Sequence, residues 1–63
     1  MNFESALQGM RFGHKLRRKE WPEGNFLFLK DGCLLEAHIN CHGDVPCKSI
    51  SDINILADDW EIV

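Results

Sequence analysis

Residues 26–37, FLFLKDGCLLEA, decide the fold because they place two strand-forming runs on either side of a tight turn. Residues 26–30 are apolar on both faces, which is typical of a central strand. Asp31-Gly32 is a favoured hairpin turn. The next run alternates, so it predicts a half-buried strand. Its two sides are Cys33, Leu35, Ala37 and Ile39, expected toward the core, and Leu34, Glu36, His38 and Asn40, expected away from it.

The segment before the hairpin predicts a helix, a strand and a turn. Apolar side chains at positions 3, 6, 7 and 10 lie on one face of a helix over 3–12, with Asn2 as its cap and Gly13 just after its end. Residues 14–21 are mostly polar and basic, which predicts an edge strand because such side chains discourage further pairing. The Pro-Glu-Gly-Asn sequence of 22–25 predicts a turn.

The segment after the hairpin predicts smaller elements. Residues 42–44 indicate a turn, and Pro46 limits any pairing beyond Val45. Residues 49–52 resemble a helix-capping box, and the apolar residues that follow line one side of a short helix: Ile50, Ile53, Leu56 and Ala57. Residues 60–63 predict a last strand. The whole pattern predicts a single α+β domain over 1–63, a small antiparallel sheet with the N-terminal helix and a second short helix packed on it.

The composition indicates a globular domain and argues against several functional classes. The 63 residues are 44% hydrophobic and 27% charged, which is unlike a disordered tail. A net charge of −3 argues against direct nucleic-acid binding, since general binders are strongly basic. The longest apolar run, 26–29, is far shorter than the roughly 20 residues of a membrane helix. Three cysteines without a signal-peptide pattern indicate reduced thiols and a cytoplasmic location.

Motifs spread along the chain resemble one family of phage proteins. They are Met1-Asn2-Phe3-x-x-Ala6-Leu7, Gly13-x-Lys15-x-x-Arg18-x-x-Trp21, residues 26–29, His38-Ile39, Val45-Pro46 and Leu56-Ala57-x-Asp59-Trp60-Glu61. This domain-of-unknown-function family contains the Thoeris anti-defence proteins, which act as sponges: they bind an immune signal and remove it from solution. The resemblance extends over 1–63, so we expect a single Thoeris anti-defence-like domain.

The chain departs from the family pattern in its middle. Family members commonly carry a longer insertion between the central strand and the His-Ile strand, which here shrinks to residues 30–35. A tryptophan usually follows the Val-Pro pair, where this chain has Cys47. The Ser-Gln step that often opens the second helix appears as Ser51-Asp52.

The resemblance implies a function based on binding. Characterised members are similar to α+β subunits assembled as homo-oligomers, so a dimer or tetramer in the host-cell cytoplasm is expected. They bind a cyclic ADP-ribose isomer or cyclic oligonucleotides in pockets at subunit interfaces without cleaving them. Another branch is associated with inhibition of CRISPR nucleases, so a protein-binding inhibitor of a host defence nuclease is the alternative.

Five residues are candidates for the ligand site. The indole of Trp21 could stack on a base, as the resemblance implies, or simply close the core over the first helix. Arg18, which fits the family's spacing to this tryptophan, and Lys15 are natural partners for phosphates, or belong to a solvated edge strand. Asn25 and Phe26 follow the turn and could reach the same pocket, although Asn25 also suits the turn itself.

The remaining chemistry-bearing residues support neither a metal nor catalysis strongly. Zinc could be held by a subset of Cys33, His38, Cys41, His42 and Cys47, but no Cys-x-x-Cys pair is present and burial is the commoner fate of an unpaired cysteine. Adjacent Cys41 and His42 would face opposite sides of a strand. No phosphate loop or hydrolase motif occurs. We therefore expect no cofactor, no metal and no enzymatic activity.

Overall fold

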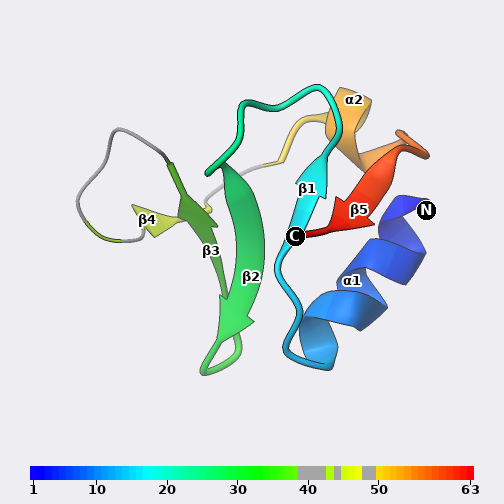
Figure 1. The fold of residues 1–63 in the computed structure, drawn as a ribbon. Coiled ribbons are helices and arrows are strands. Elements are labelled where there is room, and N and C mark those ends of the chain that lie inside the picture. Colours follow the sequence, from blue (N-terminus) through cyan, green and yellow to red (C-terminus); the bar gives the residue numbers. More distant parts are fainter. Residues whose placement is uncertain (39–42, 44, 48–49) are drawn as a thin grey trace.

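The computed structural model describes residues 1–38, 43, 45–47 and 50–63, and in them the predicted α+β class is confirmed. The elements of this part of the chain are α1 (Phe3–Arg11), β1 (Leu16–Arg18), β2 (Phe26–Lys30), β3 (Cys33–Ala37), β4 (Val45–Pro46), α2 (Asp52–Ile55) and β5 (Trp60–Ile62). The strands form one antiparallel sheet in the order β4-β3-β2-β1-β5, and α1 lies beside its β1–β5 side (Figure 1).

The central hairpin forms as predicted. Asp31 and Gly32 both have positive φ, 51° and 77°, which is the requirement of the tight turn whose twist suits paired strands. The turn sets the register of β2 on β3, from Lys30 opposite Cys33 to Phe26 opposite Ala37. The sheet is therefore organised around the segment that the sequence marks most clearly.

The prediction of an edge strand over 14–21 was wrong. The strand is only Leu16–Arg18, and it lies inside the sheet between β2 and β5. Its arginines can be charged inside the sheet because β5 and the residue before it place acidic partners beside them. Arg17 lies opposite Glu61, and its Nε is 3.6 Å from that carboxylate.

Helix α1 carries both end signals that the sequence indicated. The Asn2 side chain accepts a hydrogen bond from the Ser5 N–H at 2.9 Å. At the other end Gly13 has φ 94°, while the N–H groups of Gly13 and His14 donate to Met10 and Gly9. These are the paired bonds of a Schellman motif.

Gly9 lets α1 approach the sheet closely. A Cβ at this position would lie 3.2 Å from Cδ2 of Leu16, tighter than an ordinary contact. The helix therefore loses the roughly 1 kcal/mol of helix propensity that alanine would add and gains a close packing distance.

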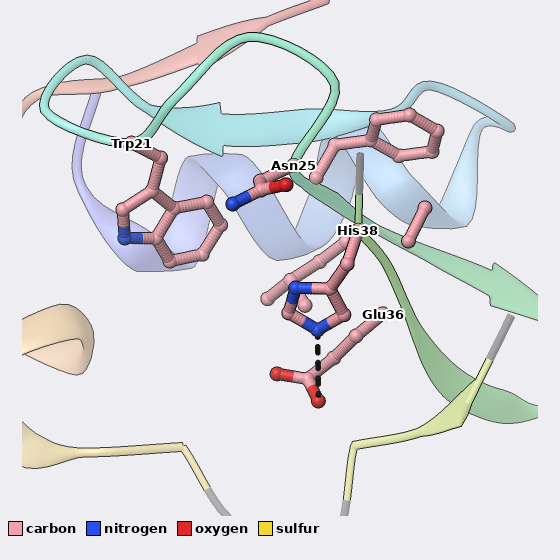
Figure 2. A pocket seen from close by; sticks show the side chains of 7 residues that line it. Trp21, Asn25, Glu36 and His38 are labelled. Atoms are coloured by element: carbon pink, nitrogen blue, oxygen red, sulfur yellow. Dashed lines mark ion pairs between the residues drawn. The ribbon is translucent and has the colours of Figure 1, made fainter. Parts of the chain in front are cut away.

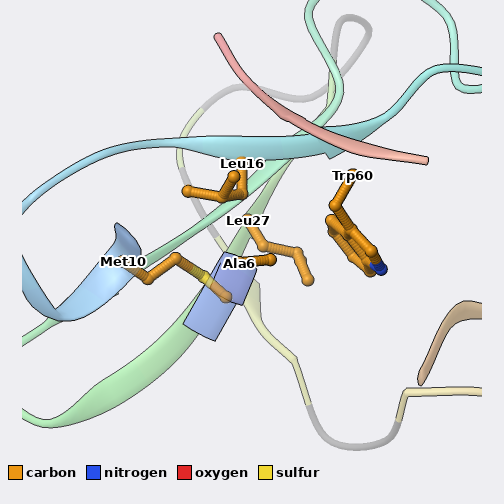
Figure 3. Close-up of a cluster of buried hydrophobic side chains, with 5 residues drawn as sticks. All are labelled: Ala6, Met10, Leu16, Leu27 and Trp60. Carbon is orange, nitrogen blue, oxygen red and sulfur yellow. The ribbon is translucent and has the colours of Figure 1, made fainter. Parts of the chain in front are cut away.

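The core lies between α1 and the sheet and is small (Figure 3). Its fully buried side chains are Ala6, Met10, Leu16, Leu27 and Trp60. Trp60, predicted to be a core residue, is 1% exposed and contacts the rings of Phe3 and Trp21 at centroid distances of 5.4 and 5.3 Å.

The core-facing side of β3 is the opposite of the one predicted. Leu34 packs against the core, whereas Cys33 is exposed. The cause is the hairpin register: Leu34 lies opposite Leu29, and cross-strand neighbours point to the same face. The continuation of this alternation at Ile39 and Asn40 lies outside the described residues.

The second helix is shorter than predicted. Helix α2 is a single turn whose N-cap, Ser51, makes no side-chain capping bond, and Ser49 of the expected capping box lies outside the described residues. Ile50 and Ala57 pack against the core, but Ile53 and Leu56 are 72% and 81% exposed. One turn is too short to carry a helical stripe across 50–57, so the predicted apolar side is not formed.

The C-terminal strand, predicted over 60–63, is confirmed as β5. Strand β4 was not predicted: Val45 and Pro46 pair with Glu36 and Leu35 as a two-residue strand at the edge of the sheet. Of the turn predicted at 42–44, Gly43 has φ 88°, while its neighbours lie outside the described residues. Neither helix in the part of the chain that the structure describes has the length and apolar character to cross a membrane.

Candidate functional site

Trp21 is held in place through its backbone. The segment after β1 bends back so that the Trp21 N–H donates to the Arg18 carbonyl at 3.0 Å. The guanidinium of Arg17 donates to three carbonyl oxygens of the same bend, those of Arg18, Lys19 and Trp21. Arg17 is also anchored to Glu61 on β5. The position of Trp21 is therefore fixed by the sheet.

The indole of Trp21 contacts the core at its edge. Its ring plane stands at 80° to that of Trp60, an edge-to-face arrangement favourable for aromatic pairs. Trp21 is half-buried rather than enclosed, and it lines two hollows of the surface. The two roles considered for it, packing on the core and presenting an aromatic surface, are thus compatible.

The first hollow, which we call the Phe26 pocket, measures about 240 Å³ and lies where the β1–β2 connection passes over the adjoining ends of β2 and β3 (Figure 2). Its lining residues are Trp21, Asn25, Phe26, Leu27, Glu36, Ala37 and His38. The structure therefore brings together three of the five predicted site residues: Trp21, Asn25 and Phe26.

The second hollow, the Ile50 pocket, measures about 310 Å³ and adjoins the first. Its lining residues are Trp21, Leu27, Glu36, Cys47, Ile50, Ser51 and Asn54. Trp21, Leu27 and Glu36 belong to both pockets, so the two hollows meet around one indole and one carboxylate.

Lys15 contacts the Phe26 ring, which lines the Phe26 pocket. Its Nζ is 5.1 Å from the centroid of the Phe26 ring, within the range of a cation–π contact. It is not among the residues that line either hollow. Lys15 thus places a positive charge against one of the aromatic rings that line the site.

Arg18 lines neither pocket and is buried in the structure. The residue is 7% exposed, and its guanidinium donates to both carboxylate oxygens of Asp59 and to the side-chain oxygen of Asn54. Glu20 lies 3.0 Å from it as a second anionic partner. The guanidinium joins β1 to α2 and to the segment before β5, so its charge is already compensated.

The ion pair between Arg18 and Asp59 shifts the pKa of both groups. The hydrogen bond from Arg18 lowers the pKa of the Asp59 carboxyl below its ordinary value. The same bond, with the charge of the carboxylate, raises the pKa of the Arg18 guanidinium. The alternative that this arginine belongs to a solvated edge strand was wrong, because β5 pairs with β1 and covers that edge.

Glu36 and His38 are site residues that sequence reasoning did not find. The hairpin places Glu36 opposite Leu27 on the face that carries the core, and His38 follows just beyond the strand. Their side chains approach to 3.7 Å, between His38 Nε2 and Glu36 Oε2 (Figure 2). The Asp31-Gly32 turn predicts that Glu36 lies opposite Leu27, but it does not reveal which face of the sheet α1 covers.

The histidine and cysteine cluster considered for zinc is only partly described. Cys41 and His42 lie outside the described residues; Cys33 is exposed at the start of β3, and Cys47 packs against the core. Within 1–38, 43, 45–47 and 50–63, no group of three or more histidine, cysteine or acidic residues is arranged to hold a metal ion.

The comparison with known proteins gives one result. The model of the Tad2-like family, the Thoeris anti-defense 2-like domain, matches residues 1–63. No curated protein and no solved structure matches the chain. The match spans every residue that lines the two pockets, from the bend that carries Trp21 to Asn54 in α2. The chain therefore belongs to the Thoeris anti-defense 2-like family, a family of phage anti-defence domains.

Proposed function

We propose that this protein binds and sequesters a cyclic nucleotide immune signal, a cyclic ADP-ribose isomer or a cyclic oligonucleotide, without cleaving it. The observation that carries the proposal is the placement of Trp21, whose indole lines two adjoining pockets while its edge rests on Trp60. A rigid, partly exposed indole is a stacking surface for a base, and such stacking contributes about 1–3 kcal/mol per base.

The dimensions of the site suit a ligand with more than one ring. Small-molecule sites usually measure about 300–1,000 Å³. The Phe26 pocket alone falls below that range, and the Ile50 pocket lies at its lower end. Because the pockets share three lining residues, a cyclic nucleotide would extend along both. Phe26 and Asn25 add an aromatic wall and an amide, and Lys15 supplies positive charge behind that wall.

Arg18 has a supporting role in this proposal. Its guanidinium is engaged by Asp59, Asn54 and Glu20, so it holds β1, α2 and β5 around the site instead of receiving a phosphate. Sequestration requires only affinity and a protein concentration above that of the messenger. Catalysis is not part of the proposed activity.

We also propose that the functional unit is a homo-oligomer, a dimer or tetramer. A chain of this size leaves much of its apolar surface uncovered, and association is a usual remedy. Alternation places Phe26, Phe28 and Leu35 on the sheet face opposite α1, and the two phenylalanine rings are 5.9 Å apart. Because Phe26 and Ala37 belong to this face and also line a pocket, a second copy seated there would border the ligand site.

The experiment is thermal melting of the pure protein against cyclic ADP-ribose isomers and cyclic di- and trinucleotides. A true ligand at 100 times its dissociation constant adds about 2.7 kcal/mol of stability, and in so small a domain each 1 kcal/mol raises Tm by roughly 4–8 °C. The Trp21→Ala variant should lose the shift. Phe12→Ala is the matched control, since Phe12 is 83% exposed and lines neither pocket.

The same samples test sequestration against cleavage. After the protein is denatured by heat, chromatography should recover the ligand chemically unchanged and in stoichiometric amount. A panel without any stabilising ligand, or a ligand recovered as a cleaved product, would rule the proposal out.

A second candidate function, inhibition of a host defence nuclease by direct binding, is supported by the surface around α2. Ile53 and Leu56 are largely exposed there, and Asp52 and Asp58 are exposed beside them. An apolar patch with acidic neighbours suits the basic groove of a nuclease. A complex with a purified CRISPR nuclease that dissociates with added salt, together with a flat ligand panel, would favour it.

A further inference from the structure

We propose that Glu36 determines how the ligand is oriented in the site. Its carboxylate accepts a pair of hydrogen bonds from the uncharged part of a nucleotide, and the phosphates lie at the rim. The donors are ribose hydroxyls or the N–H groups of a purine. This inference rests on the proposed nucleotide-binding function and specifies which part of the ligand each pocket wall receives.

The position of Glu36 is the first argument. It lines both pockets together with Trp21 and Leu27, so any ligand that stacks on the indole passes close to its carboxylate. Figure 2 shows Glu36 and His38 on the side of the Phe26 pocket across from Trp21 and Asn25. The side chain is 33% exposed, which is open enough for a ligand to reach and sheltered enough to fix its direction.

The charge of the surroundings is the second argument. No lysine or arginine of the described residues lines either pocket. His38 Nε2 lies 3.7 Å from the Glu36 carboxylate, beyond hydrogen-bond distance. An ionised carboxylate accepts hydrogen bonds only, and its two oxygens match two parallel donors. It repels a phosphate at the same place.

The place of the phosphates follows from the cations nearby. Arg17 is held by the carbonyl groups of the bend and by Glu61. Arg18 is closed off by its ion pair with Asp59, while Lys15 is exposed and lies against the Phe26 ring that walls the pocket. A base stacked on Trp21 with its hydroxyl or N–H donors on Glu36 leaves its phosphate chain toward Phe26 and Lys15. Acidic residues commonly hold ribose hydroxyls in nucleotide sites, while basic groups hold the phosphates.

The test uses uncharged nucleosides, with inorganic pyrophosphate as the charged counterpart, and follows the indole N–H signals of the two tryptophans by NMR. Guanosine carries both kinds of donor, 2′-deoxyguanosine lacks one hydroxyl, and inosine lacks the purine amino group. Inorganic pyrophosphate carries only the charge. Guanosine should shift the Trp21 indole signal, and pyrophosphate should leave it in place.

The variant Glu36→Gln should weaken guanosine binding about tenfold or more, because a charge-assisted hydrogen bond becomes a neutral one. Glu36→Asp keeps the charge but withdraws the carboxylate by one methylene, and it should weaken binding as well. Glu23→Gln is the matched control: it removes the same charge from an exposed position in the neighbouring turn and should bind as the parent protein does.

The probes identify the donors, and the variants decide the proposal. If 2′-deoxyguanosine binds more weakly than guanosine, the carboxylate holds the ribose; if inosine does, it holds the base. Unchanged guanosine binding by both Glu36 variants, or displacement of guanosine from Trp21 by pyrophosphate, would overturn the inference. If cyclic nucleotides stabilise the parent and Glu36→Gln equally, this inference fails alone. If neither nucleosides nor cyclic nucleotides bind the parent, the proposed function fails with it.

Discussion

Arg18 and Asp59 form an ion pair that joins β1 to the start of β5, and its contribution depends on pH. Folding lowers the pKa of Asp59, so its ionised form favours the folded state at pH values above the ordinary aspartate value of about 3.9. This stabilisation is lost as the pH falls from there through the lower pKa of the folded state. Asp59→Asn should therefore lower Tm at neutral pH, and the difference from the parent should shrink below pH 4.

Melting curves between pH 2.5 and 7 check this prediction. Asp31→Asn, in the exposed hairpin turn, is the control and should follow the parent curve. A Tm difference for Asp59→Asn that stays constant down to pH 2.5 would mean that the carboxylate charge does not stabilise the fold.

Arg17 is a positioning residue for Trp21, because its guanidinium donates to three carbonyl groups of the bend that carries the indole. Arg17→Lys cannot reproduce this fork of donors and should cost about 1–2 kcal/mol of stability. It should also weaken the coupling between the two perpendicular indoles, seen as a reduced tryptophan band in circular dichroism, and lower ligand affinity. Arg11→Lys, on the exposed surface of α1, should change neither. Preserved indole coupling in Arg17→Lys would contradict the positioning role.

At the scale of the element, the hairpin turn determines which residues of β3 face the site. Gly32 has φ 77° and open space around its missing Cβ, so Gly32→Ala would add backbone strain without a steric clash. The expected cost is about 1–2 kcal/mol, a Tm decrease of roughly 4–16 °C in a domain of this size. Asp31→Asn keeps a favoured turn and should leave Tm nearly unchanged. Equal melting of the two variants would show that the turn does not control hairpin stability.

At the scale of the whole molecule, the proposed oligomer depends on the sheet face opposite α1. Phe28 lies near the middle of that face, between Phe26 and Leu35. Phe28→Asp places a charge where a second copy would dehydrate it, so the mass measured by analytical ultracentrifugation should fall to that of the monomer. Phe12→Asp, on an exposed residue at the end of α1, should leave the mass unchanged. A monomeric parent protein, or an oligomer that survives Phe28→Asp, would exclude this interface.

The site illustrates which residues local patterns can identify. Trp21 was predicted from its indole and from the resemblance, and Asn25 and Phe26 because they follow the turn after it. A turn keeps its residues together whatever the rest of the chain does. Arg18 was expected at the ligand and lies instead against Asp59, a partner 41 residues away along the chain. Glu36 was not found, because its relevance depends on which face of the sheet α1 covers.

By itself, the sequence determined the central hairpin, the boundaries of α1 and the α+β class, because these depend on backbone preferences and hydrogen bonds between near neighbours. Only the tertiary structure decided that β1 lies inside the sheet, that Leu34 rather than Cys33 faces the core, and that Trp21 shares its pockets with a carboxylate. The reason is physical: β5 pairs with β1, and these two strands are far apart in the sequence, so local patterns do not predict their pairing. That pairing places β1 inside the sheet and brings Asp59 to Arg18.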